Sequence, residues 1–279
     1  MKEILKNNPN IIYNSISGVE FIQFNNLKKY ENILTHGFTT RIGGVSEGEC
    51  ATLNMGFNRK DIRENIIENY NRITKALNID ISNLVFSNQV HDKKIKLVDE
   101  NDRGKGILKE SDIKGYDGLI TDKRGVALVT FYADCVPLLF LDPVKRVIAT
   151  SHSGWRSTVR EIGKETVITM NKEYGCKSED ILAAVGPSIG KCCFEVGNEV
   201  YEEFDARLGD IDGYCERISD EKLKINLQGI IKRTLLQSGL SEENICMSDI
   251  CTKCNNDTFF SHRGDMGKTG SLAAIMQLL

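Results

Sequence analysis

The sequence predicts a single mixed α/β domain of the α+β class. Short apolar runs of strand length intermix with segments of helical periodicity, without the strict strand–helix–strand alternation of a doubly wound parallel sheet. No linker rich in proline, glycine or serine and no internal repeat divides the 279 residues. We therefore expect one domain that spans residues 1–279.

The first clear elements lie between residues 61 and 97. One helical stripe covers 61–78, with Asp61 as a candidate N-cap. Its apolar members are Ile62, Ile66, Ile67, Tyr70, Ile73 and Leu77. Short strands are expected at 84–86 and at 95–97, on either side of the segment that contains His91. His91 is therefore predicted at a strand end or in a turn.

Three buried strands are expected in the middle of the chain. The runs Val126–Phe131, Val136–Leu141 and Val147–Thr150 are short, largely apolar and rich in β-branched or aromatic residues. Pro137 cannot donate a ladder hydrogen bond, so the chain should bend or reach a sheet edge just after Cys135.

The remaining elements follow the same two periodicities. A helix is expected over 157–174, closed by Gly175, and a strand at Ile181–Val185. Two further helices are predicted around Val196, Val200 and Phe204 and around Leu227, Ile230, Ile231, Thr234 and Leu235. Ile245 and Met247 alternate as in a strand, whereas residues 272–279 fit either structure.

Composition excludes several classes of protein. The net charge of −3, with no basic stripe, argues against nucleic-acid binding. The longest apolar stretch is interrupted by Asp134 and Pro137, so no membrane-spanning helix is expected. The first residues lack the features of a secretory signal, which predicts a cytoplasmic location. In reducing cytosol the nine cysteines are expected to be thiols, ligands or nucleophiles rather than disulfides.

Three donors at three predicted strand ends form a candidate metal site. His91, Cys135 and His152 together suit Zn²⁺, with a fourth position left for water or substrate. The alternative for each histidine is a hydrogen-bonded core residue, and the spacing of the three is not a local zinc signature.

Other residues offer less specific patterns. Cys251 and Cys254 have the spacing of a metal-binding or redox pair, but no second such pair completes a four-ligand site, and we expect the adjacent Cys192 and Cys193 to pack in the core. The remaining candidates belong to substrate binding, each with packing or solvation as the alternative: Arg41 beside the Gly43-Gly44 turn, Trp155, Arg156, and His262 with Arg263 after the aromatic pair Phe259-Phe260.

Taken in order, the motifs resemble the YfiH/YlmD-like family, which is often labelled multicopper polyphenol oxidase or laccase. The resemblance runs from about residue 30 to the end. It is carried by the segments 39–46 (TTRIGGVS), 54–56 (NMG), 89–91 (QVH), 117–121 (DGLIT), 133–138 (ADCVPL), 151–156 (SHSGWR), 186–197 (GPSIGKCCFEVG), 251–252 (CT) and 259–263 (FFSHR). The chain departs from the family at Ser271, where arginine is usual, and at Asp92, where glycine is common.

This resemblance implies a four-layer α/β/β/α fold with mixed sheets, like that of deamidating toxins, and zinc bound by His91, Cys135 and His152. It implies purine nucleoside phosphorolysis of adenosine, inosine or methylthioadenosine, a transferase reaction, with accompanying adenosine deamination. The partners are then a purine nucleoside and phosphate, with no nucleic acid and no membrane. The laccase label does not fit, because four histidines cannot supply the ligands of several copper ions.

Within this interpretation, Asp134 is the candidate proton shuttle beside Cys135, and Arg41, Arg156 and Arg263 are candidate phosphate clamps. Three alternatives stay open at this stage. A metal-free cysteine hydrolase would use Cys135 as nucleophile and His152 as base, and would have no need of His91. Some relatives are credited with amidase-type editing of peptidoglycan precursors. A binding module without catalysis is the third alternative, and a monomer is the default oligomeric state.

Overall fold

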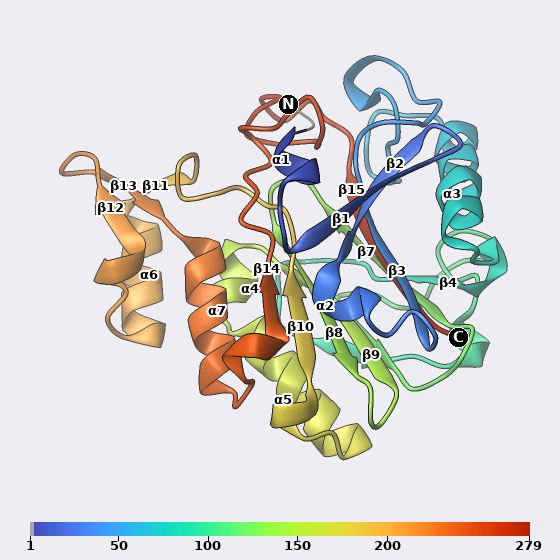
Figure 1. The fold of residues 1–279 in the computed structure, drawn as a ribbon. Coiled ribbons are helices and arrows are strands. Elements are labelled where there is room, and N and C mark those ends of the chain that lie inside the picture. The colour runs from blue at the N-terminus through green and yellow to red at the C-terminus, as the bar shows by residue number, and fades with distance from the viewer. Residues whose placement is uncertain (1–2) are drawn as a thin grey trace.

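Two six-stranded β-sheets packed face to face form the centre of the computed structural model, which describes residues 3–279 (Figure 1). The helices are α1 (Glu3–Lys6), α2 (Asn25–Lys28), α3 (Arg63–Leu77), α4 (Trp155–Val159), α5 (Ile162–Tyr174), α6 (Asn198–Leu208) and α7 (Leu227–Gln237). The strands are β1 (Ile11–Ile16), β2 (Val19–Phe24), β3 (Leu34–Thr39), β4 (Leu84–Phe86), β5 (Ile95–Leu97), β6 (Gly118–Thr121), β7 (Ala127–Tyr132), β8 (Val136–Asp142), β9 (Val147–Ser153), β10 (Leu182–Val185), β11 (Glu195–Gly197), β12 (Cys215–Arg217), β13 (Lys222–Ile225), β14 (Ile245–Met247) and β15 (Leu272–Leu278).

The first sheet has the order β1-β2-β3-β15-β7-β4 and is mixed, because β4 runs parallel to β7 while the other neighbours are antiparallel. Its central strand is the C-terminal β15, which lies between β3 and β7. Both faces of β15 are buried, so its sequence lacks the alternation of a half-exposed strand. This explains why residues 272–279 could not be assigned from periodicity.

The second sheet has the order β14-β10-β8-β9-β6-β5 and is also mixed, with parallel pairs at both ends. The prediction of a bend at Pro137 is only partly right, because this residue lies inside β8. Its carbonyl accepts from Gly186 N–H, so its nitrogen faces the same side, where pairing with β10 has already ended at Leu138. The missing N–H therefore falls just beyond the last residue pair of that ladder, Val185 with Leu138.

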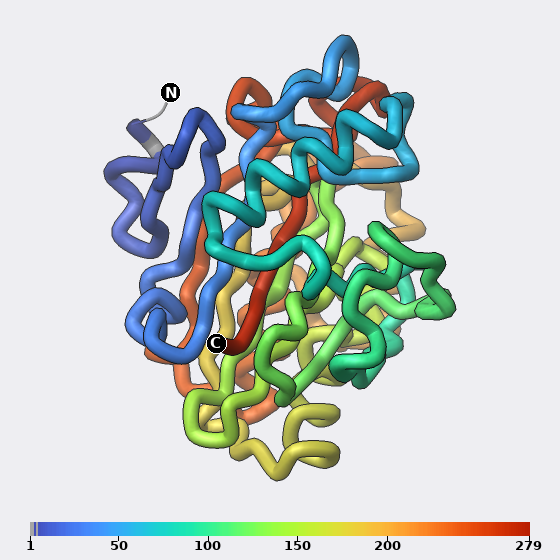
Figure 2. Tube along the Cα trace, turned by 90° about the vertical axis from the view of Figure 1, so that its right-hand side faces the viewer, coloured from blue at the N-terminus to red at the C-terminus, as the bar shows by residue number. Residues whose placement is uncertain are grey.

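Three apolar cores separate four layers. One core lies between the sheets, a second between the first sheet and α3, and a third between the second sheet and α4–α7. Figure 2 shows α3, in teal, lying across the outer face of the first sheet. A small antiparallel sheet, β11-β13-β12, extends beside α6 (Figure 1). The predicted mixed α+β fold is confirmed.

Several element boundaries differ from the predictions. The helix predicted over 157–174 is two helices, because Glu161 adopts the left-handed conformation between α4 and α5. Gly175 caps α5 as expected. Val196 belongs to β11 rather than to α6, and α3 begins after Ile62, so Asp61 is not its N-cap. Within residues 3–279, none of the helices combines the length and the apolar character needed to cross a bilayer.

Candidate metal centre and active site

Strand register brings the three predicted ligands together. His152 lies near the end of β9 and pairs with Pro137 near the start of the antiparallel β8, two residues after Cys135. His91 lies in the loop between β4 and β5, with a positive φ of 61°. Their ligand atoms all lie within 4.8 Å of one another.

The donor set and its spacing fit a zinc ion. Cys135 Sγ is 3.8 Å from His91 Nε2. A tetrahedral zinc with ordinary Zn–S and Zn–N distances separates such a sulfur and nitrogen by about 3.6 Å. One thiolate and two imidazoles leave the fourth position open, which is the pattern of catalytic rather than structural zinc sites.

A buried carboxylate behind the ligands fixes their orientation. Asp117, which directly precedes β6, is fully buried. Its Oδ1 accepts from His152 Nδ1 at 2.8 Å and from His91 N–H at 2.9 Å, and its Oδ2 accepts from the N–H groups of Val90 and Asp92. With Nδ1 held as the donor to Asp117, Nε2 is the His152 nitrogen left to bind a metal in place of a proton.

The charges and hydrogen bonds among Cys135, His152 and Asp117 favour the ionised form of each side chain. Burial raises the pKa of the Cys135 thiol, but the charge of His152 and the hydrogen bonds from His152 and His91 outweigh burial and lower the pKa to about 6. Burial alone lowers the pKa of His152, but the Cys135 thiolate and Asp117 raise it to about 9. Burial also raises the pKa of Asp117, and its hydrogen bond with His152 reverses this effect, so the net shift is downward.

Close packing leaves room for only a glycine at position 154. A Cβ built on Gly154 would lie 2.6 Å from His91 Cδ2 and 3.1 Å from Cys135 Sγ. Any larger side chain would therefore displace two of the three candidate ligands.

The three candidate ligands open onto a cavity of about 660 Å³, which is large enough for a nucleoside-sized ligand. Aromatic side chains line it, namely Phe57, Phe86, Phe131 and Tyr132. Cationic or titratable groups also line it, namely Arg59, Lys114 and His262. The cavity thus combines apolar surface with groups that can hold an anion.

Asp134 is held on the side of the C-terminal loops. Its Oδ1 accepts from Thr252 Oγ1 at 2.6 Å and its Oδ2 from Arg263 N–H at 2.7 Å. Both oxygens thus bond to residues other than the candidate ligands. The predicted proton-shuttle role of Asp134 stays a prediction.

Of the predicted substrate-binding residues, His262 lines the cavity and the other four lie outside its described lining. Arg41 Nη1 donates to the Asn256 carbonyl at 2.6 Å, and its guanidinium stacks on Phe260. Arg156 lies over the ring of Trp155, which packs against the helix-side core, and Arg263 Nη1 donates to the Glu195 carbonyl.

The Gly43-Gly44 turn and the aromatic pair Phe259-Phe260 were both considered with substrate binding. The N–H groups of Gly43 and Gly44 both donate to Thr52 Oγ1, so this turn is closed on itself rather than offered to an anion. Phe259 and Phe260 are fully buried core residues.

The prediction that Cys192 and Cys193 pack in the core is wrong for Cys192, which is exposed. Cys193 is half-buried and packs against the helix-side core. Both sulfurs instead lie beside the sulfur of Cys254.

Sequence reasoning missed Asp117, Gly154 and Arg59. Asp117 and Gly154 stand in the DGLIT and SHSGWR motifs, so motif membership was a signal, but no pattern indicated their roles. No sequence pattern indicated Arg59. Its Nε donates to Ser271 Oγ at 2.8 Å, and Ser271 stands where the family usually has an arginine.

Comparison with known proteins finds a matching family model and several similar proteins. The family model described as multi-copper polyphenol oxidoreductase laccase matches residues 35–279. The chain is 35% identical over 241 residues to purine nucleoside phosphorylase YlmD of Bacillus subtilis, covering 86% of this chain and 87% of that protein. It is 36% identical over 196 residues to adenosine deaminase RL5 of an unknown prokaryotic organism, covering 69% and 74%.

The fold is shared with a solved relative. The crystal structure of YlmD from Geobacillus stearothermophilus superposes with a TM-score of 0.90 at 31% identity, covering 97% of this chain and 99% of that one.

Proposed function

The chain belongs to the YfiH/YlmD-like family, whose model is described as multi-copper polyphenol oxidoreductase laccase. We propose that it is a zinc-dependent purine nucleoside phosphorylase that also deaminates adenosine. One observation carries the proposal. His91, Cys135 and His152, oriented by Asp117, open onto a cavity lined by aromatic rings and cationic groups.

In this proposal His91, Cys135 and His152 hold the zinc. The ion would supply a Lewis acid at the edge of the cavity. The contribution of the protein is orientation, because Asp117 holds His152 by its side chain and the His91 loop by its backbone.

The purine base would lie against the aromatic side of the cavity. Phe57 and Phe131 are half-buried and flank the buried Phe86, with ring centroids 5.9 and 5.5 Å from it. A planar base gains both apolar burial and favourable ring contacts on such a surface.

Phosphate would bind at the cationic side, near Arg59, Lys114 and His262. Within residues 3–279, no carboxylate forms an ion pair with Arg59, so its guanidinium is available to an anion. In the reaction a phosphate oxygen forms a bond to C1′ as the bond from C1′ to purine N9 breaks. The phosphate proton passes to the base, giving free purine and sugar 1-phosphate.

A second candidate function rests on one specific observation. The thiol of Cys135, the imidazole of His152 and the carboxylate of Asp117 form a nucleophile, base and orienting group, as in cysteine hydrolases. His91 distinguishes the two functions, because zinc needs its Nε2 as a third ligand, whereas a Cys135–His152 dyad can act without it.

The test is product analysis with adenosine and inosine in the presence and absence of phosphate. Phosphorolysis predicts hypoxanthine and ribose 1-phosphate from inosine only when phosphate is present. Conversion of adenosine to inosine without phosphate is the deamination that the proposal includes. No turnover of either nucleoside, together with a reactive Cys135 thiol, would favour the cysteine hydrolase.

The role of Arg59 is tested separately. Arg59→Ala should raise the KM for phosphate about tenfold or more, equivalent to about 1.4 kcal/mol. Arg72→Ala, at a surface arginine paired with Glu68, should leave that KM unchanged. An unchanged KM in Arg59→Ala would move the phosphate site elsewhere in the cavity.

A further inference from the structure

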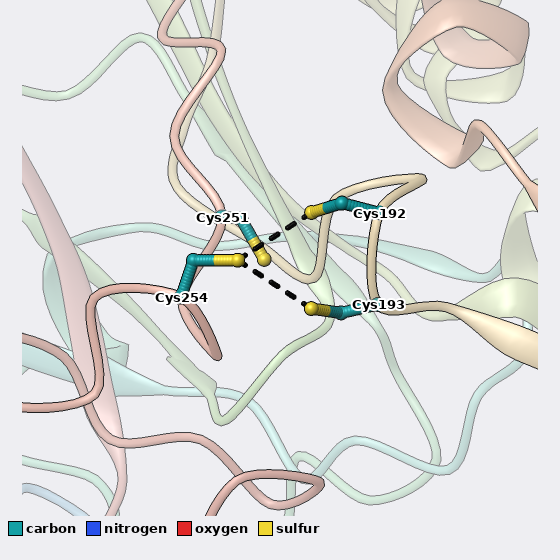
Figure 3. Close-up of side chains that lie close together, drawn as sticks. All are labelled: Cys192, Cys193, Cys251 and Cys254. Carbon is teal, nitrogen blue, oxygen red and sulfur yellow. Dashed lines mark hydrogen bonds between the residues drawn. The ribbon is translucent and has the colours of Figure 1, made fainter.

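Four cysteines from two distant loops converge on one point (Figure 3). Cys192 and Cys193 come from the loop after β10, and Cys251 and Cys254 come from the loop after β14. All four sulfurs lie within 4.8 Å of one another. The proposed catalytic site uses none of them.

The separations match a tetrahedral thiolate site. Cys254 Sγ lies 3.6 Å from Cys192 Sγ and 3.5 Å from Cys193 Sγ. Four sulfurs around one zinc ion at ordinary Zn–S distances are about 3.8 Å apart. Sulfurs joined in a disulfide are about 2.0 Å apart, and a disulfide would unite two sulfurs rather than gather four.

The two cysteine loops approach each other closely at Gly190. A Cβ on Gly190 would lie 3.1 Å from Cys251 Cβ and 3.3 Å from Cys192 Sγ. A side chain at this position would push these neighbours away by a few tenths of an ångström, so glycine favours the close approach of the two loops.

The two loops are registered by their backbones as well. Ser188 and Cys251 form a parallel β-bridge, with Ser188 N–H bonded to the Ile250 carbonyl and Thr252 N–H bonded to the Ser188 carbonyl. This bridge places the cysteines of both loops on the same side before any ligand binds.

From this convergence we propose that Cys192, Cys193, Cys251 and Cys254 bind one structural zinc ion, separate from the ion at His91, Cys135 and His152. Four thiolates without a histidine or water form a closed site, which is the pattern of structural zinc. The inference does not depend on the proposed nucleoside chemistry.

A zinc ion bound by the four cysteines would stabilise the segment that contains Cys135, which lines the cavity. Asp134 accepts from Thr252 Oγ1 and from Arg263 N–H, and its carbonyl accepts from Ile189 N–H at 2.8 Å. Residues from both cysteine loops therefore hold the residue that precedes Cys135. A zinc ion joining these loops would stiffen that support.

Metal analysis of the full-length protein, purified under reducing conditions, tests the proposal. The wild type should carry about two zinc ions per chain, and Cys135→Ser and Cys254→Ser should each carry about one. Cys192→Ser, at an exposed position that perturbs the core little, gives a second reading should Cys254→Ser fail to fold. Cys215→Ser, at a half-buried cysteine on β12 outside the cluster, is the matched control and should keep both ions.

Cobalt(II) identifies the ligands directly. Loaded into Cys135→Ser, it should give an intense sulfur-to-metal charge-transfer band that Cys135→Ser/Cys254→Ser lacks. No metal in Cys135→Ser, iron in place of zinc, or a disulfide detected by intact mass among these four cysteines would overturn the proposal.

Discussion

Replacing Asp117 by asparagine removes the charge of the residue that orients the candidate ligands while keeping its shape. The carboxylate accepts four hydrogen bonds, two at each oxygen, from His152 Nδ1 and from three backbone N–H groups. An amide accepts at one end only, so its NH₂ group must face two donors. If the NH₂ group faces His152, the imidazole Nδ1 must accept instead of donate, so the proton moves to Nε2, which can then no longer bind a metal.

The cost can be estimated from these contacts. Loss of such an orienting partner lowers metal affinity roughly 10- to 100-fold, or about 1.4–2.7 kcal/mol. A donor left unsatisfied costs about 1–3 kcal/mol in the free energy of unfolding when it is buried, and less for the part-buried N–H groups of residues 90–92. We therefore expect Asp117→Asn to weaken zinc binding at the catalytic site and to lower the stability of the metal-free protein.

The assay is competition with a chelator of known affinity, together with urea unfolding of the metal-free protein. Asp92→Asn is the matched control, because the Asp92 side chain bonds to Arg160 and to Lys93 N–H rather than to a candidate ligand. Zinc affinity of Asp117→Asn within twofold of the wild type would refute the orienting role.

Two further predictions concern packing and pH. Gly154→Ala should lose metal at the His91-containing site, because the new Cβ would lie 2.6 Å from His91 Cδ2. Gly213→Ala, whose Cβ meets open space, should keep its metal. Metal analysis that finds both variants fully loaded would contradict the packing argument. Burial, with the charge of Lys28, lowers the pKa of His36 to about 3, and His36 Nε2 accepts a hydrogen bond from Phe24 N–H. As the pH falls below 6.5, the His36 imidazole therefore becomes protonated only in the unfolded chain. The free energy of unfolding should thus fall by about 2 kcal/mol between pH 7.5 and 5 because of His36, and urea titrations should show a shallower fall in His36→Gln. Equal slopes in the two proteins would refute the assignment.

Much of the fold could be predicted from the sequence, because burial on one or both faces leaves a readable pattern. The strand at 84–86 and the C-cap at Gly175 are as predicted. The break at Glu161 was missed, since a left-handed residue in a continuous apolar stripe has no periodic signature. The strand β15 was ambiguous because tertiary burial on both faces removed its alternation.

The candidate site divides in the same way. His91, Cys135 and His152 could be proposed because strand ends present side chains to a common edge. Asp117 was missed because an aspartate before a glycine is typical of a turn. The cysteine cluster was missed because Cys192 and Cys254 are 62 residues apart, and only the packing of the second sheet brings their loops together.

Zinc content and inosine phosphorolysis, measured on the same preparations of wild type and Cys135→Ser, test most directly whether Cys135 holds a catalytic metal. We predict that the variant lacks one zinc ion per chain and has lost phosphate-dependent release of hypoxanthine. A variant that keeps its full zinc content, or that still releases hypoxanthine at the wild-type rate, would contradict the claim that Cys135 holds a catalytic metal.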